Sequence, residues 1–117
     1  MKYMLLIYFD ESWGQLSLAE RQQIYWGQMQ LADQLTSNGQ YLGGAPLQPP
    51  STATSVRVRD GKALLTDGPF AETREQLGGY MLIDVEDLDQ AITIAARGPV
   101  ARVGIVEVRP VREGPPT

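Results

Sequence analysis

Apolar and polar positions along the chain predict strands and helices in alternation. The run KYMLLIYF at residues 2–9 is apolar without regular alternation, which is typical of a strand covered on both faces. Ser17 and Glu20 then have the spacing of a capping box, which predicts that a helix begins here. Apolar residues follow at helical spacing and predict its buried face: Leu18, Ile24, Tyr25, Met29, Leu31, Ala32 and Leu35. Asn38 and Gly39 are expected to end the helix.

The middle of the chain predicts an irregular strand and a hairpin. Residues 40–47, QYLGGAPL, form a short strand that the two glycines and the proline should make irregular or bulged, and residues 48–53 form a loop. In TSVRVRDGKALLT, Asp60-Gly61 is the typical pair of a type I′ turn. This turn places Val58 opposite Ala63 and Val56 opposite Leu65 on one face, with Arg57 and Arg59 on the other. We expect one buried and one charged hairpin face.

The last third predicts a strand, a helix and a strand. GGYMLIDV at residues 78–85 is the first strand, Asp87 caps the helix with Gln90 at its third position, and Gly98-Pro99 ends it. Apolar spacing gives this helix a predicted burial face of Leu88, Ala91, Ile92, Ala95 and Ala96. Residues 104–111 form the final strand. The order predicts the α+β class and a ferredoxin-like fold, βαββαβ with an inserted hairpin, in one domain of residues 1–112. Residues 113–117 are expected to be a disordered tail.

A ferredoxin-like sheet carries its helices on one face only. We expect the other face to be lined by Leu5, Ile7, Met81 and Ile83, which would leave an exposed apolar patch of several hundred Å². A second copy of the same sheet, related by a two-fold axis, is the simplest cover. The sequence therefore predicts a homodimer with its sheets packed face to face.

Composition removes several classes of function. The chain has 117 residues, no cysteine and no histidine, which excludes disulfides, thiol chemistry and imidazole ligands, so no metal and no cofactor is expected. A net charge of −4 argues against a nucleic-acid partner. There is no apolar run of about 18 residues, so we expect no membrane partner and a cytoplasmic protein.

The segment TDGPFAETREQLGG at residues 66–79 allows two interpretations. In the structural one, Asp67 forms an Asx turn, Gly68 supplies an unusual φ and Pro69 fixes the direction of the chain. In the functional one, the Asp67 carboxylate is an acid/base group at the mouth of a pocket. Trp13 is a further aromatic that lines either a pocket or the core. The candidate ligand-binding residues are Tyr8, Trp26, Arg57, Phe70, Glu72, Arg74, Glu75 and Gln76.

Three segments carry a resemblance to a known family. MKYMLLIY at the N-terminus, GGAPLQPPSTATSVRVRDGKALLTDGPFAETREQLGGY in the centre and IVEVRPV near the C-terminus resemble the YCII-related family, specifically its DGPF-domain branch, over residues 1–112. The resemblance implies a ferredoxin-type α+β protein that pairs into a dimeric α/β barrel. Some members of the branch are associated with alternative sigma factors. Other members of the wider family have a His/Asp pair for which hydrolase or lyase chemistry is suggested, but this chain has no histidine to carry it.

Three functions therefore stay open. The first is the binding of a small molecule in a cleft between the sheet and the helices of a homodimer. The second is a small enzyme of the hydrolase or lyase type that uses Asp67 as its acid/base. The third is a regulatory protein-interaction module linked to an alternative sigma factor.

Overall fold

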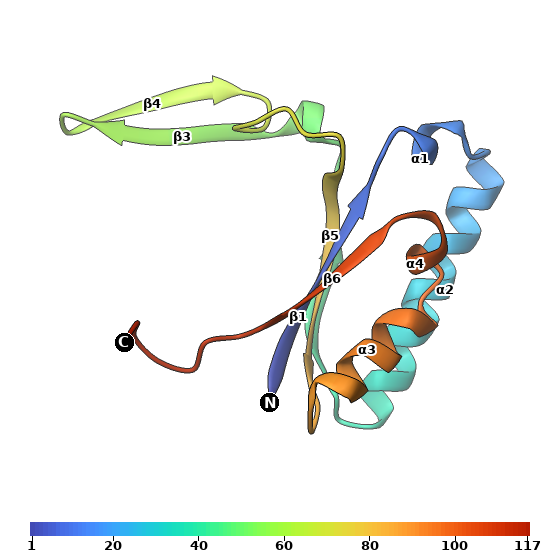
Figure 1. Cartoon of the computed structure of the whole chain (residues 1–117). Helices are drawn as coiled ribbons and strands as arrows, with labels where there is room; N and C mark the ends of the chain where they lie inside the picture. The colour runs from blue at the N-terminus through green and yellow to red at the C-terminus, as the bar shows by residue number, and fades with distance from the viewer.

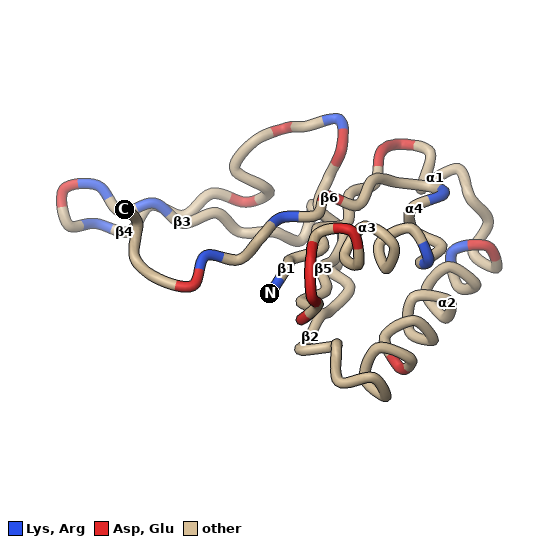
Figure 2. The backbone as a smooth tube through the Cα atoms, turned by 60° about the horizontal axis from the view of Figure 1, so that its bottom comes forward, with Lys and Arg blue, Asp and Glu red and all other residues tan.

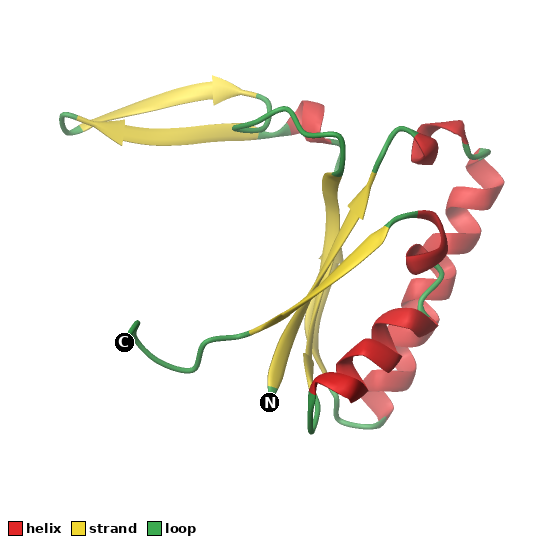
Figure 3. Cartoon of the chain, in the orientation of Figure 1, coloured by secondary structure: helices red, strands yellow, loops and turns green.

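The computed structural model describes residues 1–117 and shows a four-stranded sheet with helices on one face and a separate hairpin (Figures 1 and 3). The strands are β1 (Lys2–Phe9), β2 (Tyr41–Pro46), β3 (Thr54–Arg59), β4 (Lys62–Asp67), β5 (Gln76–Asp84) and β6 (Ile105–Pro110). The helices are α1 (Ser12–Gln15), α2 (Leu18–Ser37), the 3₁₀ turn η1 (Pro50–Thr52), α3 (Leu88–Arg97) and α4 (Val100–Val103). Every predicted strand and both long helices are present. None of the helices combines the length and the apolar character that a membrane span requires.

The sheet has the strand order β2-β5-β1-β6, and every neighbouring pair is antiparallel. The two βαβ units interleave in this order, which confirms the ferredoxin-like α+β fold. The predicted irregularity of β2 is confirmed as a register shift between Tyr41 and Gly43. A second shift, between Ile7 and Tyr8 of β1, leaves Gly78 without a partner on that strand.

The predicted helix ends are confirmed. Ser17 accepts a hydrogen bond from the Glu20 backbone N–H, and the Glu20 side chain accepts one from the Ser17 N–H, each at 3.1 Å. Asn38 caps the other end of α2, and Gly39 follows with φ of 71°. The carboxylate of Asp87 accepts from the Gln90 N–H at 2.9 Å and begins α3.

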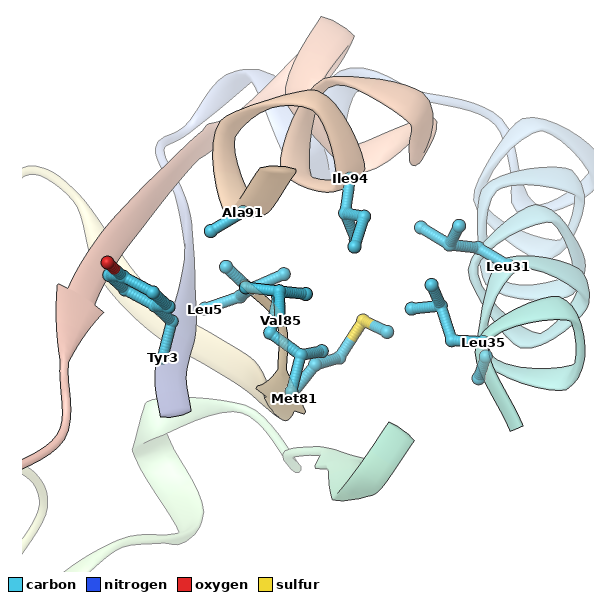
Figure 4. Packing of buried hydrophobic residues seen from close by; sticks show 10 residues of the cluster. Tyr3, Leu5, Leu31, Leu35, Met81, Val85, Ala91 and Ile94 are labelled. Carbon is cyan, nitrogen blue, oxygen red and sulfur yellow. The ribbon is translucent and has the colours of Figure 1, made fainter. Parts of the chain in front are cut away.

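The core lies between the sheet and the helices (Figure 4). It contains the four residues that we expected on the uncovered face, Leu5, Ile7, Met81 and Ile83, each no more than 7% exposed. That expectation was wrong: these four side chains face the helices, and the alternate residues of the same strands face away from them. Successive side chains of a strand point to opposite faces, so a shift of one residue exchanges the two sets.

The uncovered face carries the alternate residues of the same strands. Met4 pairs with Leu82 and Leu6 with Tyr80, and their side chains are partly exposed. On β6 the same face is charged: Glu107 pairs with Leu6 and accepts two hydrogen bonds of 2.9 Å from Arg109. The Tyr8 hydroxyl donates to Glu107 at 3.4 Å. The face is thus apolar with a neutralised ion pair at one edge.

The burial faces of both long helices differ from prediction. In α2 only Leu31, Ala32 and Leu35 are buried, whereas Leu18 is 64% exposed, because the N-terminal half of the helix does not pack on the core. In α3 the buried residues are Ala91 and Ile94, while Leu88 and Ile92 are about half exposed. The small Ala91 side chain lets α3 approach the sheet, and Ile94 fills the space beside it.

The hairpin has the predicted register but not the predicted buried face. Val56 pairs with Leu65 and Val58 with Ala63, and Asp60 and Gly61 have the positive φ of a type I′ turn. Val56, Val58 and Leu65 are nevertheless at least 60% exposed. The reason is that the hairpin projects from the sheet on the side away from the helices, so that no other part of the chain covers it (Figure 1). Lysine and arginine surround Asp60 at its tip (Figure 2).

Candidate functional site

A cleft of about 450 Å³ lies between the sheet and the middle of α2. Its walls come from β1, β2 and β5 near the root of the hairpin, from α1 and α2, and from residues 47–50. Of its 24 lining residues 14 are hydrophobic, which is the usual character of a small-molecule site. Three residues of the predicted apolar stripe of α2, Ile24, Tyr25 and Met29, line the cleft. Leu18 of the same stripe lies in neither the core nor the cleft.

Phe9 and Trp13 form an aromatic wall of the cleft. Their ring centroids are 4.2 Å apart at an interplanar angle of 31°. Gly78 on β5 and Gly104 before β6 leave room for the Phe9 ring. A Cβ added to Gly78 would lie 2.5 Å from the ring, and one added to Gly104 would lie 3.1 Å from it. Gly78 thus has a packing role in addition to its place in the bulge.

Tyr41 lies in the cleft on β2. Its hydroxyl is close to the backbone of Gly44, where a Cβ would be only 2.8 Å from the oxygen. Burial raises the pKa of Tyr41, and the neighbouring Tyr80 raises it further, so the hydroxyl is protonated at neutral pH. It has no hydrogen-bond partner within the chain and is available to a ligand.

Asp10 is the one charged residue that lines the cleft. Its Oδ1 accepts hydrogen bonds from the Ser12 hydroxyl at 2.5 Å and from the Ser12 N–H at 2.9 Å. These bonds hold the pKa of Asp10 below its ordinary value, and the guanidinium of Arg74 lowers it further. Asp10 is therefore a carboxylate at neutral pH, with Oδ2 unbonded within the chain. The other polar side chains of the cleft are neutral: Gln28, Gln48, Gln76 and the three tyrosines Tyr25, Tyr41 and Tyr80.

Some residues singled out in the sequence lie in this cleft. Gln76, Gly78 and Gly79, at the start of β5, line it, and so does Trp13 of α1. Gly78 is the bulged residue of β5 and also part of the cleft wall.

Other candidate ligand-binding residues lie elsewhere. Tyr8 is on the uncovered sheet face with Glu107, and Trp26 is 66% exposed beside Tyr25. Arg57 is on the hairpin, and Phe70, Glu72, Arg74 and Glu75 are exposed in the segment between β4 and β5. Arg74 comes near the cleft through its charge interaction with Asp10.

Asp67 ends β4 opposite Thr54, outside the cleft. Its carboxylate makes no hydrogen bond, so the predicted Asx turn is not formed. Two other hydrogen bonds hold the chain where it leaves β4. The Gly68 N–H donates to the Ala53 carbonyl at 2.7 Å, and the Ser55 hydroxyl donates to the Gly68 carbonyl at 2.9 Å. Gly68 has the expected positive φ, 93°.

Phe9, Asp10 and Tyr41 are among the cleft residues that the sequence did not single out. Phe9 and Asp10 stand where the first apolar run ends, and Tyr41 is the first residue of the glycine-containing strand β2. For Tyr41 the available signal was the glycine pair that follows it, because closely approaching glycines leave space for rings.

Comparison with known proteins agrees with this fold. Residues 1–114 match the model of the YCII-related domain. The chain is also similar to "Uncharacterized protein R00369" of Rhizobium meliloti (strain 1021), with 35% identity over 114 residues, or 95% of this chain and 92% of that protein. With the family model matched over nearly the whole length and a relative of this identity, the chain belongs to the YCII-related domain family.

Proposed function

We propose that this protein binds a small molecule in the cleft between the sheet and α2. The observation that carries the proposal is the cleft itself: about 450 Å³, mostly apolar, with the protonated Tyr41 and the ionised Asp10 among its lining residues. Apolar walls with a few polar groups are how proteins bind and orient small ligands. Asp67 lies outside the cleft, and the proposal gives it no role.

The binding form is proposed to be a homodimer. Met4, Leu6 and Leu82 are only partly covered on the sheet face that has no helices, and a second sheet at about 10 Å would bury them. The charges on this face do not oppose such packing, because Glu107 and Arg109 already neutralise each other.

The hairpin supports the same assembly. It projects on the side of the uncovered face, where the partner would lie (Figure 1). An isolated two-stranded hairpin is at best marginally stable in water, so β3 and β4 need a surface to pack on. The exposed apolar face of Val56, Val58 and Leu65 provides the contact.

A pair of tryptophan substitutions on α2 tests the proposal. Met29 lines the cleft and is half-buried, so Met29→Trp should fill it, whereas Gln30→Trp adds the same indole on the exposed side of the helix. A library of small metabolites is screened by thermal shift against the natural chain. Ligands that raise its Tm should have no effect on Met29→Trp and an unchanged effect on Gln30→Trp. Ligands that stabilise both variants equally would place the binding site elsewhere.

A further inference from the structure

The charge and aromatic content of the cleft restrict its ligand further. The cleft wall contains one carboxylate and neither lysine nor arginine. Five of the lining residues are aromatic: Phe9, Trp13, Tyr25, Tyr41 and Tyr80. The faces of aromatic rings attract cations, and the attraction increases where water is excluded.

This inference rests on the proposed function. We infer that the cleft is selective for an organic ammonium ion, that is, a small aromatic or apolar molecule with one positive charge. Asp10 is its counter-ion. The hydrogen bonds from Ser12 use Oδ1 of Asp10 and fix the carboxylate, while Oδ2 has no partner within the chain. An ammonium group can therefore pair with Oδ2 while the apolar part of the ligand contacts Phe9 and Trp13.

An anionic ligand fits the same walls poorly. It would place its charge beside the Asp10 carboxylate without a basic lining residue to compensate it. Arg74 is the basic residue whose charge acts on Asp10, but it is exposed and outside the cleft wall. It competes with a cationic ligand for the carboxylate, so its removal should favour cation binding.

Three probes of similar size and different charge test this inference: phenyltrimethylammonium, its neutral analogue tert-butylbenzene, and the anion benzenesulfonate. Trp26→Phe leaves Trp13 as the single tryptophan, so its fluorescence reports binding in the cleft. We expect the cation to bind about 5- to 30-fold more tightly than the neutral analogue, with the anion weakest.

Two substitutions in the same background assign the selectivity. Asp10→Asn should lose most of the preference for the cation, while the amide oxygen can still accept from Ser12 and keep the turn. Arg74→Gln should leave cation binding unchanged or tighter. Equal binding of cation and neutral analogue, an unchanged preference in Asp10→Asn, or tightest binding of benzenesulfonate would overturn the inference and leave the binding cleft standing. Failure of all three probes to change Trp13 fluorescence would overturn both.

Discussion

The Phe9 ring stacks on Trp13 with 4.2 Å between centroids, at the end of β1 where the sheet meets the cleft. The contact joins a strand of the sheet to α1, the short helix beside the cleft. It exists because the neighbouring glycines place no side chain where the Phe9 ring lies. The shape of the cleft therefore depends on residues that carry no chemistry of their own.

Gly78→Ala should disturb this stack. The added Cβ would lie 2.5 Å from the Phe9 ring, and overpacking of this kind destabilises by about 1–3 kcal/mol. Denaturant unfolding measures the loss, and near-ultraviolet circular dichroism should show the displaced aromatic pair. Gly14→Ala in α1 is the matched control, since nothing lies within 4 Å of its Cβ position. Equal stability of the two variants would argue against the packing role of Gly78.

Leu6→Asp should disrupt the proposed dimer. The substitution places a charge in the middle of the uncovered face, and burying an unpaired charge is strongly unfavourable. Sedimentation at micromolar concentration should give twice the 12.9 kDa mass for the natural chain and the monomer mass for the variant. Ile92→Asp, on the exposed side of α3, should remain dimeric. A natural chain that sediments as a folded monomer would refute the dimer.

Two neighbouring positions test the contribution of the hairpin. Val58 is on the apolar face of β3 and Arg57 on the other face. Val58→Glu should weaken dimerisation, because it puts a carboxylate into the contact, whereas Arg57→Glu should have a smaller effect. Both positions are exposed in the single chain, so circular dichroism should show no loss of fold. If Val58→Glu dimerises as the natural chain does, the partner does not cover this face.

The capping box of α2 should contribute a pH-dependent part of the stability. Hydrogen bonds from Ser17 hold the pKa of Glu20 below its ordinary value of 4.5. The stabilisation is therefore complete above the pKa of the unfolded chain and is lost as the pH falls through the lower folded value. The Tm difference between the natural chain and Glu20→Ala should shrink on acidification over that range. Ser17→Ala should itself lower stability by about 1 kcal/mol at neutral pH.

Asp67→Asn should leave stability within about 0.5 kcal/mol of the natural chain, because its exposed carboxylate makes no hydrogen bond. Thermal unfolding provides the measurement. A variant that folds normally but loses an activity present in the natural chain would support the hypothesis that Asp67 is an acid/base group.

Helix caps and turns were predictable from the sequence because their signals are local. Ser17 with Glu20, Asp87 with Gln90, and Asp60-Gly61 each form the predicted interaction or backbone geometry. The faces of the elements were less predictable. An apolar run such as KYMLLIYF is apolar on both sides, so only packing decides that Leu5 is buried and Leu6 is not.

The cleft was only partly predictable for a similar reason. Gln76 and the glycine pair belong to a conspicuous motif, but the remaining walls come from β1, β2 and α2, distant in sequence. Asp10 appeared only as the end of an apolar run, and its position beside the cleft depends on the turn with Ser12. The α2 stripe likewise did not reveal that half of it borders a cleft instead of the core.

Chemical-shift mapping of amide and indole resonances during titration with phenyltrimethylammonium tests the central claim most directly. If the cleft is the binding site, the largest changes should fall on the Trp13 indole and on the amides of Gly44 and residues 76–79. Hairpin amides of residues 54–67 should change little. Changes confined to the hairpin or to residues 70–75, or an unperturbed Trp13, would contradict the account.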